Sequence, residues 1–322
     1  MSFTRAKTKI EDVIVPEVYA PYVLQKATAK SKLINSAIVT GNADIDLSKG
    51  GKEVKMPFWK NLTGDDEILD DSSDLTVGKI EADADNACIL VRGRAWAVND
   101  LANLFSGDNA MEAIAEKTAE YWAKQKQEVL LSTLEGIFGS ALSSHVYDIS
   151  SKTGAEAIVS AKALIEAEGK MGDNYDNLAG IMCNSATMTK LRQLDLIDTI
   201  PDSEGKKTIP TYLGLPVIVD DSLKATSDGV QTIYLFGNGA ITYKEGNGVR
   251  NIELDRDSLG GDDLYITRHQ FVMHPNGVKW KGTPAKATAS NTELATAGNW
   301  ELVDEAKNVP IVCLKCRTVE AQ

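Results

Sequence analysis

The acidic segment between residues 65 and 74 is the densest group of side chains in this sequence that could bind an ion. Within ten positions it carries six carboxylates: Asp65, Asp66, Glu67, Asp70, Asp71 and Asp74. A helix–loop–helix calcium site needs acids at alternate positions, then a glycine, then a glutamate at the twelfth position, and this spacing is missing. The segment is therefore interpreted as a solvated loop or as one that meets a basic neighbour, with a weak ion site as the alternative.

Histidine is scarce in the sequence, with three residues in 322. His145 follows a long helical segment and is expected to be exposed. His269 and His274 are five residues apart on an expected strand, so they face opposite sides and could not hold one metal ion between them. Pro275 and Gly277 in the next stretch, HPNGVKW, are typical of a turn, which indicates a bend between two strands.

The four cysteines, Cys88, Cys183, Cys313 and Cys316, are too few and too scattered for a disulfide framework. The single CxxC pair lies in an expected strand and lacks the second ligand pair of a zinc site, so reduced structural thiols are predicted. Motifs for a serine nucleophile, a metalloprotease or a phosphate-binding loop are missing as well. We therefore predict no catalytic residue, no cofactor and no metal ion.

The overall charge limits the classes of partner. The chain has 34 Lys and Arg against 46 Asp and Glu, a formal charge of −12. Such a balance argues against general nucleic-acid binding, which depends on many basic residues, but not against a protein that surrounds nucleic acid. The sequence contains neither a membrane-spanning apolar run nor a secretory signal, so an intracellular start and no membrane contact are expected.

The apolar pattern predicts an α+β fold. Two strand-like stretches, GKEVKMPFWKNL and DNACILVRGRAWAV, flank the acidic segment and predict a long β-hairpin. Because an isolated hairpin is marginally stable, it should pack on another surface, possibly another subunit. Apolar residues at three- and four-residue steps over 107–143 predict a helix of about 45 Å. Further helices are expected over 153–173 and over 185–195, the second with Ser185 as its N-cap, and residues 283–299 are expected to be an exposed connector.

In this order the elements resemble the major capsid proteins of tailed double-stranded DNA bacteriophages with the Hong Kong 97 fold. The resemblance covers the whole chain and rests on VIVPEVYAPYVLQKATAKSKLINSAIV, VKMPFWKNLTGDDEIL, the stretch from RGRAWAV to TLEGIF, HPNGVKW and NWELVDEAKNVPIV. It implies an N-terminal arm, an extended hairpin loop, a peripheral domain with a spine helix, an axial domain and a return to the peripheral domain. The corresponding ranges are 1–40, 41–98, 99–152, 153–270 and 271–322.

The resemblance implies a structural protein of the virion capsid and not an enzyme, assembled in the host cytoplasm. Copies would form the pentamers and hexamers of an icosahedral head that encloses double-stranded DNA without sequence-specific binding. The short arm implies a separate scaffolding protein, and a portal and a decoration protein are further implied partners. The arm and the hairpin lack cores of their own, so inter-subunit contacts are expected at Val15, Tyr19, Tyr22, Trp59, Asp65, Asp66, Glu67, Asp70 and Asp71.

Two alternatives remain open at this point. An encapsulin-like nanocompartment shell would share the same fold but enclose cargo enzymes in a cell. A soluble ion-binding or hydrolytic protein would instead use the acids of residues 65–74.

Overall fold

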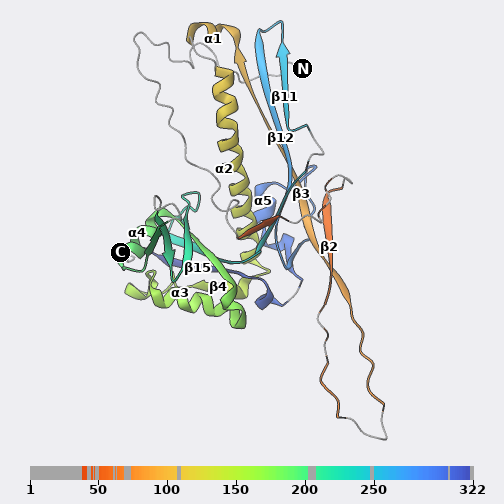
Figure 1. Ribbon diagram of the computed structural model, residues 1–322, viewed down its shortest axis with the longest axis vertical. Coiled ribbons are helices and arrows are strands. Elements are labelled where there is room, and N and C mark those ends of the chain that lie inside the picture. Colours follow the sequence, from red (N-terminus) through yellow and green to blue (C-terminus); the bar gives the residue numbers. More distant parts are fainter. Residues whose placement is uncertain are drawn as a thin grey trace.

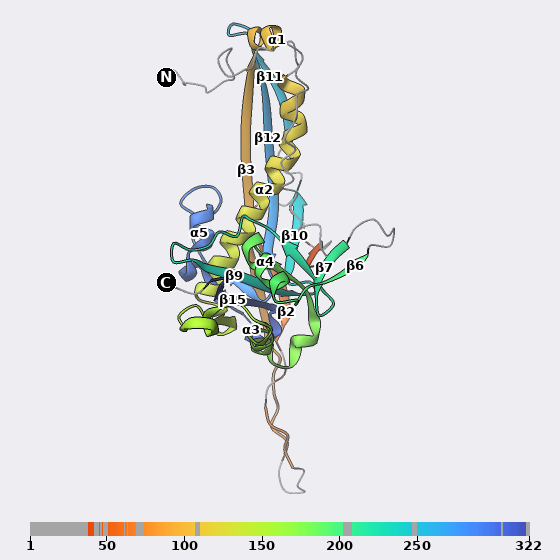
Figure 2. The same cartoon turned by 90° about the vertical axis from the view of Figure 1, so that its left-hand side faces the viewer.

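The computed structural model describes residues 38–41, 45, 47, 51–60, 62, 64–68, 74–106, 110–201, 208–246, 250–303 and 305–319. The molecule is elongated, with a hairpin at one end and a narrow tip at the other (Figure 1). A broader body lies beside the lower part of the long helix, and Figure 2 shows the two ends again on opposite sides of this body. None of the helices in the described part of the chain combines the length and apolar character needed to span a bilayer.

A six-stranded sheet forms the long axis of the molecule. Its central strands are β3 (Ala82–Asn99) and β12 (Asp262–Pro275), which pair antiparallel from Ile89↔Val272 to Asn99↔Asp262. Alternating exposure along the neighbouring strand β2 (Glu53–Trp59) follows the two-residue period of a strand. The other members are β1 (Val39–Gly41), β10 (Ile241–Gly246), β11 (Ile252–Asp257) and β2 (Glu53–Trp59).

The long helix α2 (Ala110–Gly139) lies along β12 and β3. Trp122 Nε1 donates a hydrogen bond to Thr267 Oγ1 at 2.9 Å. The rings of Trp96 and Tyr121 meet edge to face, with centroids 5.2 Å apart. The predicted long helix is therefore confirmed, with the apolar stripe that its periodicity indicated packed against a sheet.

A seven-stranded mixed sheet forms the body beside α2. Its strand β9 (Val230–Gly237) is buried on both faces, with Tyr234 and Phe236 toward α2 and Ile233 and Leu235 toward the opposite layer. That layer includes α3 (Ala161–Glu168) and α4 (Ser185–Gln193). The sheet runs in the order β4 (Val146–Asp148), β15 (Ile311–Arg317), β9, β5 (Leu178–Cys183), β8 (Leu215–Val219), β7 (Thr208–Tyr212) and β6 (Asp198–Pro201).

Several short elements complete the described fold. A two-stranded sheet is formed by β13 (Val278–Trp280) and β14 (Trp300–Leu302). The remaining helices are α1 (Asp100–Ser106), α5 (Asn291–Ala295) and the 3-10 helices Ser143–His145, Gly154–Ala157, Gly169–Asn177, Ala297–Asn299 and Ala306–Asn308.

Membership of the two large sheets does not follow the boundary expected at residue 270. The strands β10 to β12, over 241–275, pair with each other and with β3 in the six-stranded sheet. Conversely, β15 at 311–317 joins the seven-stranded sheet beside β9. Both pairings join residues far apart in the sequence, so they could not be predicted from the local apolar pattern.

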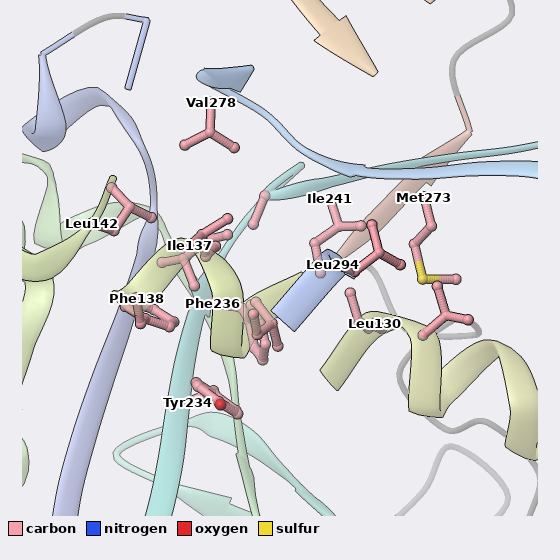
Figure 3. Packing of buried hydrophobic residues seen from close by; sticks show 14 of the residues in the cluster. Leu130, Ile137, Phe138, Leu142, Tyr234, Phe236, Ile241, Met273, Val278 and Leu294 are labelled. Carbon is pink, nitrogen blue, oxygen red and sulfur yellow. The ribbon is translucent and has the colours of Figure 1, made fainter. Parts of the chain in front are cut away.

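The largest apolar core joins α2 to both sheets (Figure 3). Leu130, Ile137 and Phe138 of α2 lie in this core together with Phe236 and Tyr234 of β9. The rings of Phe138 and Tyr234 are stacked, with centroids 5.6 Å apart. Because this core is shared, the body and the long sheet are held together as one unit by hydrophobic burial.

Three expectations about local structure are wrong. The helix expected over 153–173 is α3 flanked by 3-10 turns, because Ser160 begins α3 by accepting a hydrogen bond from Ala163 N. The N-cap of α4 is Asn184, one residue before the expected Ser185, since its side chain accepts from Thr187 N at 2.9 Å. His145 is 2% exposed, with Nδ1 2.9 Å from the carbonyl oxygen of Ile311.

The segment 283–299, expected to be an exposed connector, instead packs against α2. Ser290 and Glu293 form a reciprocal capping box that begins α5. Leu294 is buried in the main core, and Trp300 Nε1 donates to its carbonyl oxygen at 2.7 Å. This polar, turn-rich segment therefore contains a short helix, α5, that packs against α2.

The expected turn after β12 is confirmed, since Gly277 has φ +86° between β12 and β13. The four cysteines are buried and unpaired with one another. Burial raises the pKa of Cys183, Cys313 and Cys316 to about 12, which makes these thiols poor nucleophiles.

Glu245 on β10 joins three elements through its carboxylate. His269 Nδ1 lies 2.6 Å from Oε1, Lys126 Nζ of α2 lies 3.2 Å from the same oxygen, and the Tyr243 hydroxyl donates to Oε2 at 3.1 Å. The hydrogen bond with His269 and the charge of Lys126 lower the pKa of Glu245 from 4.5 to about 2. This carboxylate is therefore expected to stabilise the fold above about pH 4.5 and to stop doing so as pH falls toward 2.

Glu245→Gln is expected to lower the free energy of unfolding at neutral pH and to make little difference near pH 2. The reason is that the folded state stabilises the ionised carboxylate more than the unfolded state does. The neutral amide of glutamine gains no such electrostatic stabilisation on folding. Denaturant unfolding of both proteins from pH 7 to pH 2 measures the difference. A gap that stays constant over this range would contradict the assigned role of the carboxylate.

Candidate assembly surfaces

The hairpin at one end of the molecule extends well beyond its paired base. The strands β2 and β3 pair from Glu53↔Cys88 to Trp59↔Ala82. One step further, Lys60 N donates to Glu81 O at 2.9 Å and Lys60 Nζ forms an ion pair with Asp83 at 3.1 Å. The described residues between 62 and 80 continue outward from this base (Figure 1). They are exposed throughout, so the hairpin has little packing on its own subunit.

Large apolar side chains are unusually exposed on this hairpin. Six of them have between 52% and 95% of their surface accessible: Trp59, Leu62, Ile68, Leu75, Val77 and Ile80. Clustered apolar exposure on a soluble protein marks an interaction surface, and a two-stranded ribbon alone cannot bury these side chains. The hairpin therefore presents an apolar contact surface to another molecule.

The acidic residues share the hairpin with these apolar side chains. Asp65, Asp66 and Glu67 are exposed, and Thr76 N donates to Glu67 Oε2 at 2.9 Å across the hairpin. Hydrogen bonding with Thr76 lowers the pKa of Glu67, which keeps this carboxylate ionised. Within the described ranges, no three His, Cys, Asp or Glu side chains are grouped closely enough to hold a metal ion. The acids fit a polar rim that orients an apolar contact.

The contact residues expected from the sequence divide into two groups. The structure places Trp59, Asp65, Asp66 and Glu67 together on the exposed hairpin. The others, Val15, Tyr19, Tyr22, Asp70 and Asp71, lie outside the described residues. Contact of any of them with another subunit stays a prediction.

A buried polar cluster fixes the base of the hairpin. Asp85 lies on β3 opposite Met56 of β2, four residues beyond the last β3–β12 pair, and is almost completely buried. Its Oδ1 is 2.7 Å from His274 Nε2, and its Oδ2 accepts a hydrogen bond from Gly277 N at 3.0 Å. The carboxylate therefore ties the start of the hairpin to the turn between β12 and β13.

Asp85→Asn is expected to destabilise the subunit by about 1.5 kcal/mol, because an amide cannot satisfy both partners as the carboxylate does. With the amide NH₂ facing Nε2, the His274 proton must move to Nδ1, which has no partner among the described residues. Denaturant unfolding of the unassembled subunit measures the loss. Asp83→Asn is the matched control at the surface and should change stability little, whereas equal effects of the two substitutions would contradict the role given to Asp85.

A second exposed apolar surface lies at the opposite tip. Arg256 of β11 forms ion pairs with Asp100 at 2.5 Å and Asp263 at 2.7 Å, which fasten α1 to the β11–β12 ribbon. Sequence reasoning missed this surface, although the apolar positions in DLANLFSGDN were a usable signal. The exposed side chains are Leu101, Leu104, Phe105, Ile252, Leu254 and Leu259.

The two ends together hold most of the exposed apolar side chains. Twelve of the eighteen large apolar residues that are exposed in the described part of the chain lie on the hairpin or at the opposite tip. The two surfaces are built from different elements, the β2–β3 hairpin at one end and α1 with β11 at the other, and acidic residues accompany the apolar side chains on both. Unlike surfaces at opposite ends suit head-to-tail association, in which rings close when the rotation between copies allows it.

Comparison with known proteins shows which family has this sequence and fold. Residues 24–312 match the family described as Gp13-like, major capsid protein 13-like. The major capsid protein of Bacillus phage SPP1 is 39% identical over 322 residues, which cover 97% of this chain and 99% of that protein. Among solved structures, the capsid of Ralstonia phage GP4 is similar with a TM-score of 0.66 at 9% identity, covering 99% of both chains.

The fold is shared more widely than the sequence. A structure from Mycobacterium phage Che8 has a TM-score of 0.58 at 14% identity, covering 93% of this chain and 96% of that one. The encapsulin of Synechococcus elongatus PCC 7942 has a TM-score of 0.57 at 9% identity, covering 99% and 94%. At such identities these likenesses show the fold alone, which is the Hong Kong 97 type, whereas the full-length sequence match is to a phage protein. The chain belongs to the Gp13-like family of phage major capsid proteins.

Proposed function

We propose that copies of this protein join head to tail, hairpin to neighbouring subunit, to form the pentamers and hexamers of an icosahedral head. As a phage major capsid protein the chain is located in the virion capsid. The observation that carries the proposal is the concentration of exposed apolar side chains at the two opposite ends of the subunit. Burying them on a neighbour would supply the hydrophobic free energy of assembly.

The body fits the centre of each pentamer or hexamer in this proposal. It comprises most of the proposed axial segment 153–270 together with β15, which the sheet pairing adds. The long sheet and α2 then form the peripheral part, within which the hairpin and the opposite tip face adjacent subunits. Residues 1–40 are proposed to act as an arm that contacts other copies.

The acidic balance of the chain suits a wall around packaged DNA. A formal charge of −12 repels phosphate, so double-stranded DNA would be enclosed without being bound tightly. A separate scaffolding protein, a portal and a decoration protein are the further partners of this proposal. The family is one of structural proteins, which favours this function over the ion-binding or hydrolytic alternative.

Electron microscopy of the full-length protein, purified alone and with its candidate scaffolding protein, tests the proposal. Closed shells of uniform diameter in the presence of the scaffolding protein are the expected result. A monomer under all assembly conditions would contradict it. Shells that close around a cellular enzyme without phage partners would favour the encapsulin-like alternative.

A further inference from the structure

A large groove lies between part of α2 and the seven-stranded sheet, beside the core that joins them. Its volume is about 1280 Å³. One wall is formed by the α2 residues Leu131 and Glu135, and the floor by Tyr234 of β9 and Cys313 of β15. The opposite wall is formed by Val219 at the end of β8 and by the loop over 220–226 that follows it. The groove is large enough to receive a polypeptide segment, and the assembly surfaces described above do not include it.

A buried polar group without a partner lines this groove. Gln127 is 2% exposed, and its Nε2 donor has no hydrogen-bond acceptor among the described residues. Buried donors in native proteins are almost always paired. Trp122 Nε1 on the same helix and Trp300 Nε1 beside it both have hydrogen-bond acceptors. The α2 wall of the groove therefore carries a buried donor that the described part of the isolated subunit leaves unsatisfied.

Ile38, the first residue that the structure describes, lies close to the groove. Ile38 packs over Gly180 of β5, with its Cδ1 3.1 Å from the position of a Cβ on that glycine. Met182, two residues further along β5, pairs with Tyr234 in the groove floor. Two residues of a strand span about 7 Å. The segment that precedes Ile38 is therefore tethered at the edge of the groove.

The composition of that segment matches the groove. Residues 1–37 carry six Lys and Arg against three Asp and Glu, the reverse of the balance in the remaining chain. The groove is lined by four acids and three lysines around an apolar floor: Glu128, Glu135, Asp220, Asp221, Lys124, Lys224 and Lys315. Apolar residues such as Val23 and Leu24 suit the floor. Tethering also gives residues 1–37 a high effective concentration that no free partner has.

We propose that residues 1–37 of the same chain occupy this groove in the unassembled subunit. The segment would lie between α2 and the loop that follows β8, where its apolar side chains would cover the half-buried Leu131 and its basic side chains would face Glu135 and Asp221. The inference does not depend on shell formation, so it and the proposed function can fail separately.

Photo-crosslinking of the full-length, unassembled subunit tests this proposal. A benzoylphenylalanine at Glu135, which is exposed at the groove wall, is expected to crosslink to peptides from residues 1–37. The product should run as a monomer and form equally at all protein concentrations. The same amino acid at Lys117, on α2 but away from the groove lining, should give no such product. Crosslinks only to another copy, only to the body, or none at all would overturn the proposal.

Limited trypsin digestion supplies an independent readout with charge variants. Glu135→Lys should weaken docking of the basic segment, so cleavage at Lys26, Lys30 and Lys32 should become about threefold faster. Glu120→Lys makes the same charge change on α2 outside the groove and should leave these rates unchanged. Equal cleavage rates in the two variants would overturn the proposal.

Discussion

Gly136→Ala is expected to destabilise the subunit by about 3 kcal/mol, although alanine is the better helix former. In an open helix the change would stabilise by about 1 kcal/mol. Here, however, a Cβ at position 136 would lie 2.0 Å from the carbonyl oxygen of Leu294 and 2.6 Å from Trp300 Nε1. These two atoms form the hydrogen bond that anchors α5. The added methyl group would therefore overlap the backbone of Leu294, which can move away only if α5 leaves the core.

Gly169→Ala is the matched control for this prediction. Gly169 follows α3 with helical backbone angles, φ −59° and ψ −16°, and a Cβ there would meet nothing within 4 Å. Its replacement should leave stability unchanged or raise it slightly, because only the unfolded chain loses freedom. Denaturant unfolding of both variants measures the contrast. If Gly136→Ala were as stable as the original protein, the packing of α5 against α2 would be wrong.

Removal of two apolar side chains from the hairpin is expected to block assembly without affecting the fold. Trp59→Ser with Val77→Ser deletes two side chains that are 66% and 95% exposed on the single subunit. Each is worth about 1.5–3 kcal/mol once fully buried on a neighbour. A loss of about 3 kcal/mol per contact lowers the association constant about a hundredfold. Shell yield, measured by sedimentation and electron microscopy, should therefore fall at least about tenfold at a fixed concentration.

The thermal unfolding midpoint of the double variant serves as its internal check and should match that of the original subunit. Ile165→Ser is the external control, because this α3 residue is 55% exposed but lies on neither end surface. It should leave assembly unchanged. Normal shell yield from the double variant would show that the hairpin apolar residues are not the contact that drives assembly.

The elements with strong local signals were predictable from the sequence. Apolar residues at helical spacing specify α2, because a stripe of that length must be buried along one side. Alternating residues in β2 and β3 specify the hairpin base, and Pro275 with Gly277 specifies the turn after β12. In each case the physical cause lies within one element or between neighbours in the chain.

The features that were missed depend on contacts between distant parts of the chain. His145 is buried because Ile311, 166 residues later, provides its partner. The helix α5 is ordered because Gly136 leaves room for it on α2, which no property of residues 283–299 reveals. The apolar tip near Leu104 escaped notice because its side chains come from two segments that β11 and α1 bring together only in the fold.

The length of β3 has a consequence for the geometry of any lattice that these subunits build. Its 18 residues run without interruption from the hairpin to the base of α1, a span of about 60 Å. This one strand therefore fixes the distance between the two surfaces that are proposed to contact other copies. The distance between equivalent points on neighbouring subunits would then depend on the number of residues in β3. The curvature of the shell would depend on the angle between one subunit and the next. Two residues added within β3 and two within its partner β12 would lengthen that repeat by about 7 Å while preserving which side chains face inward.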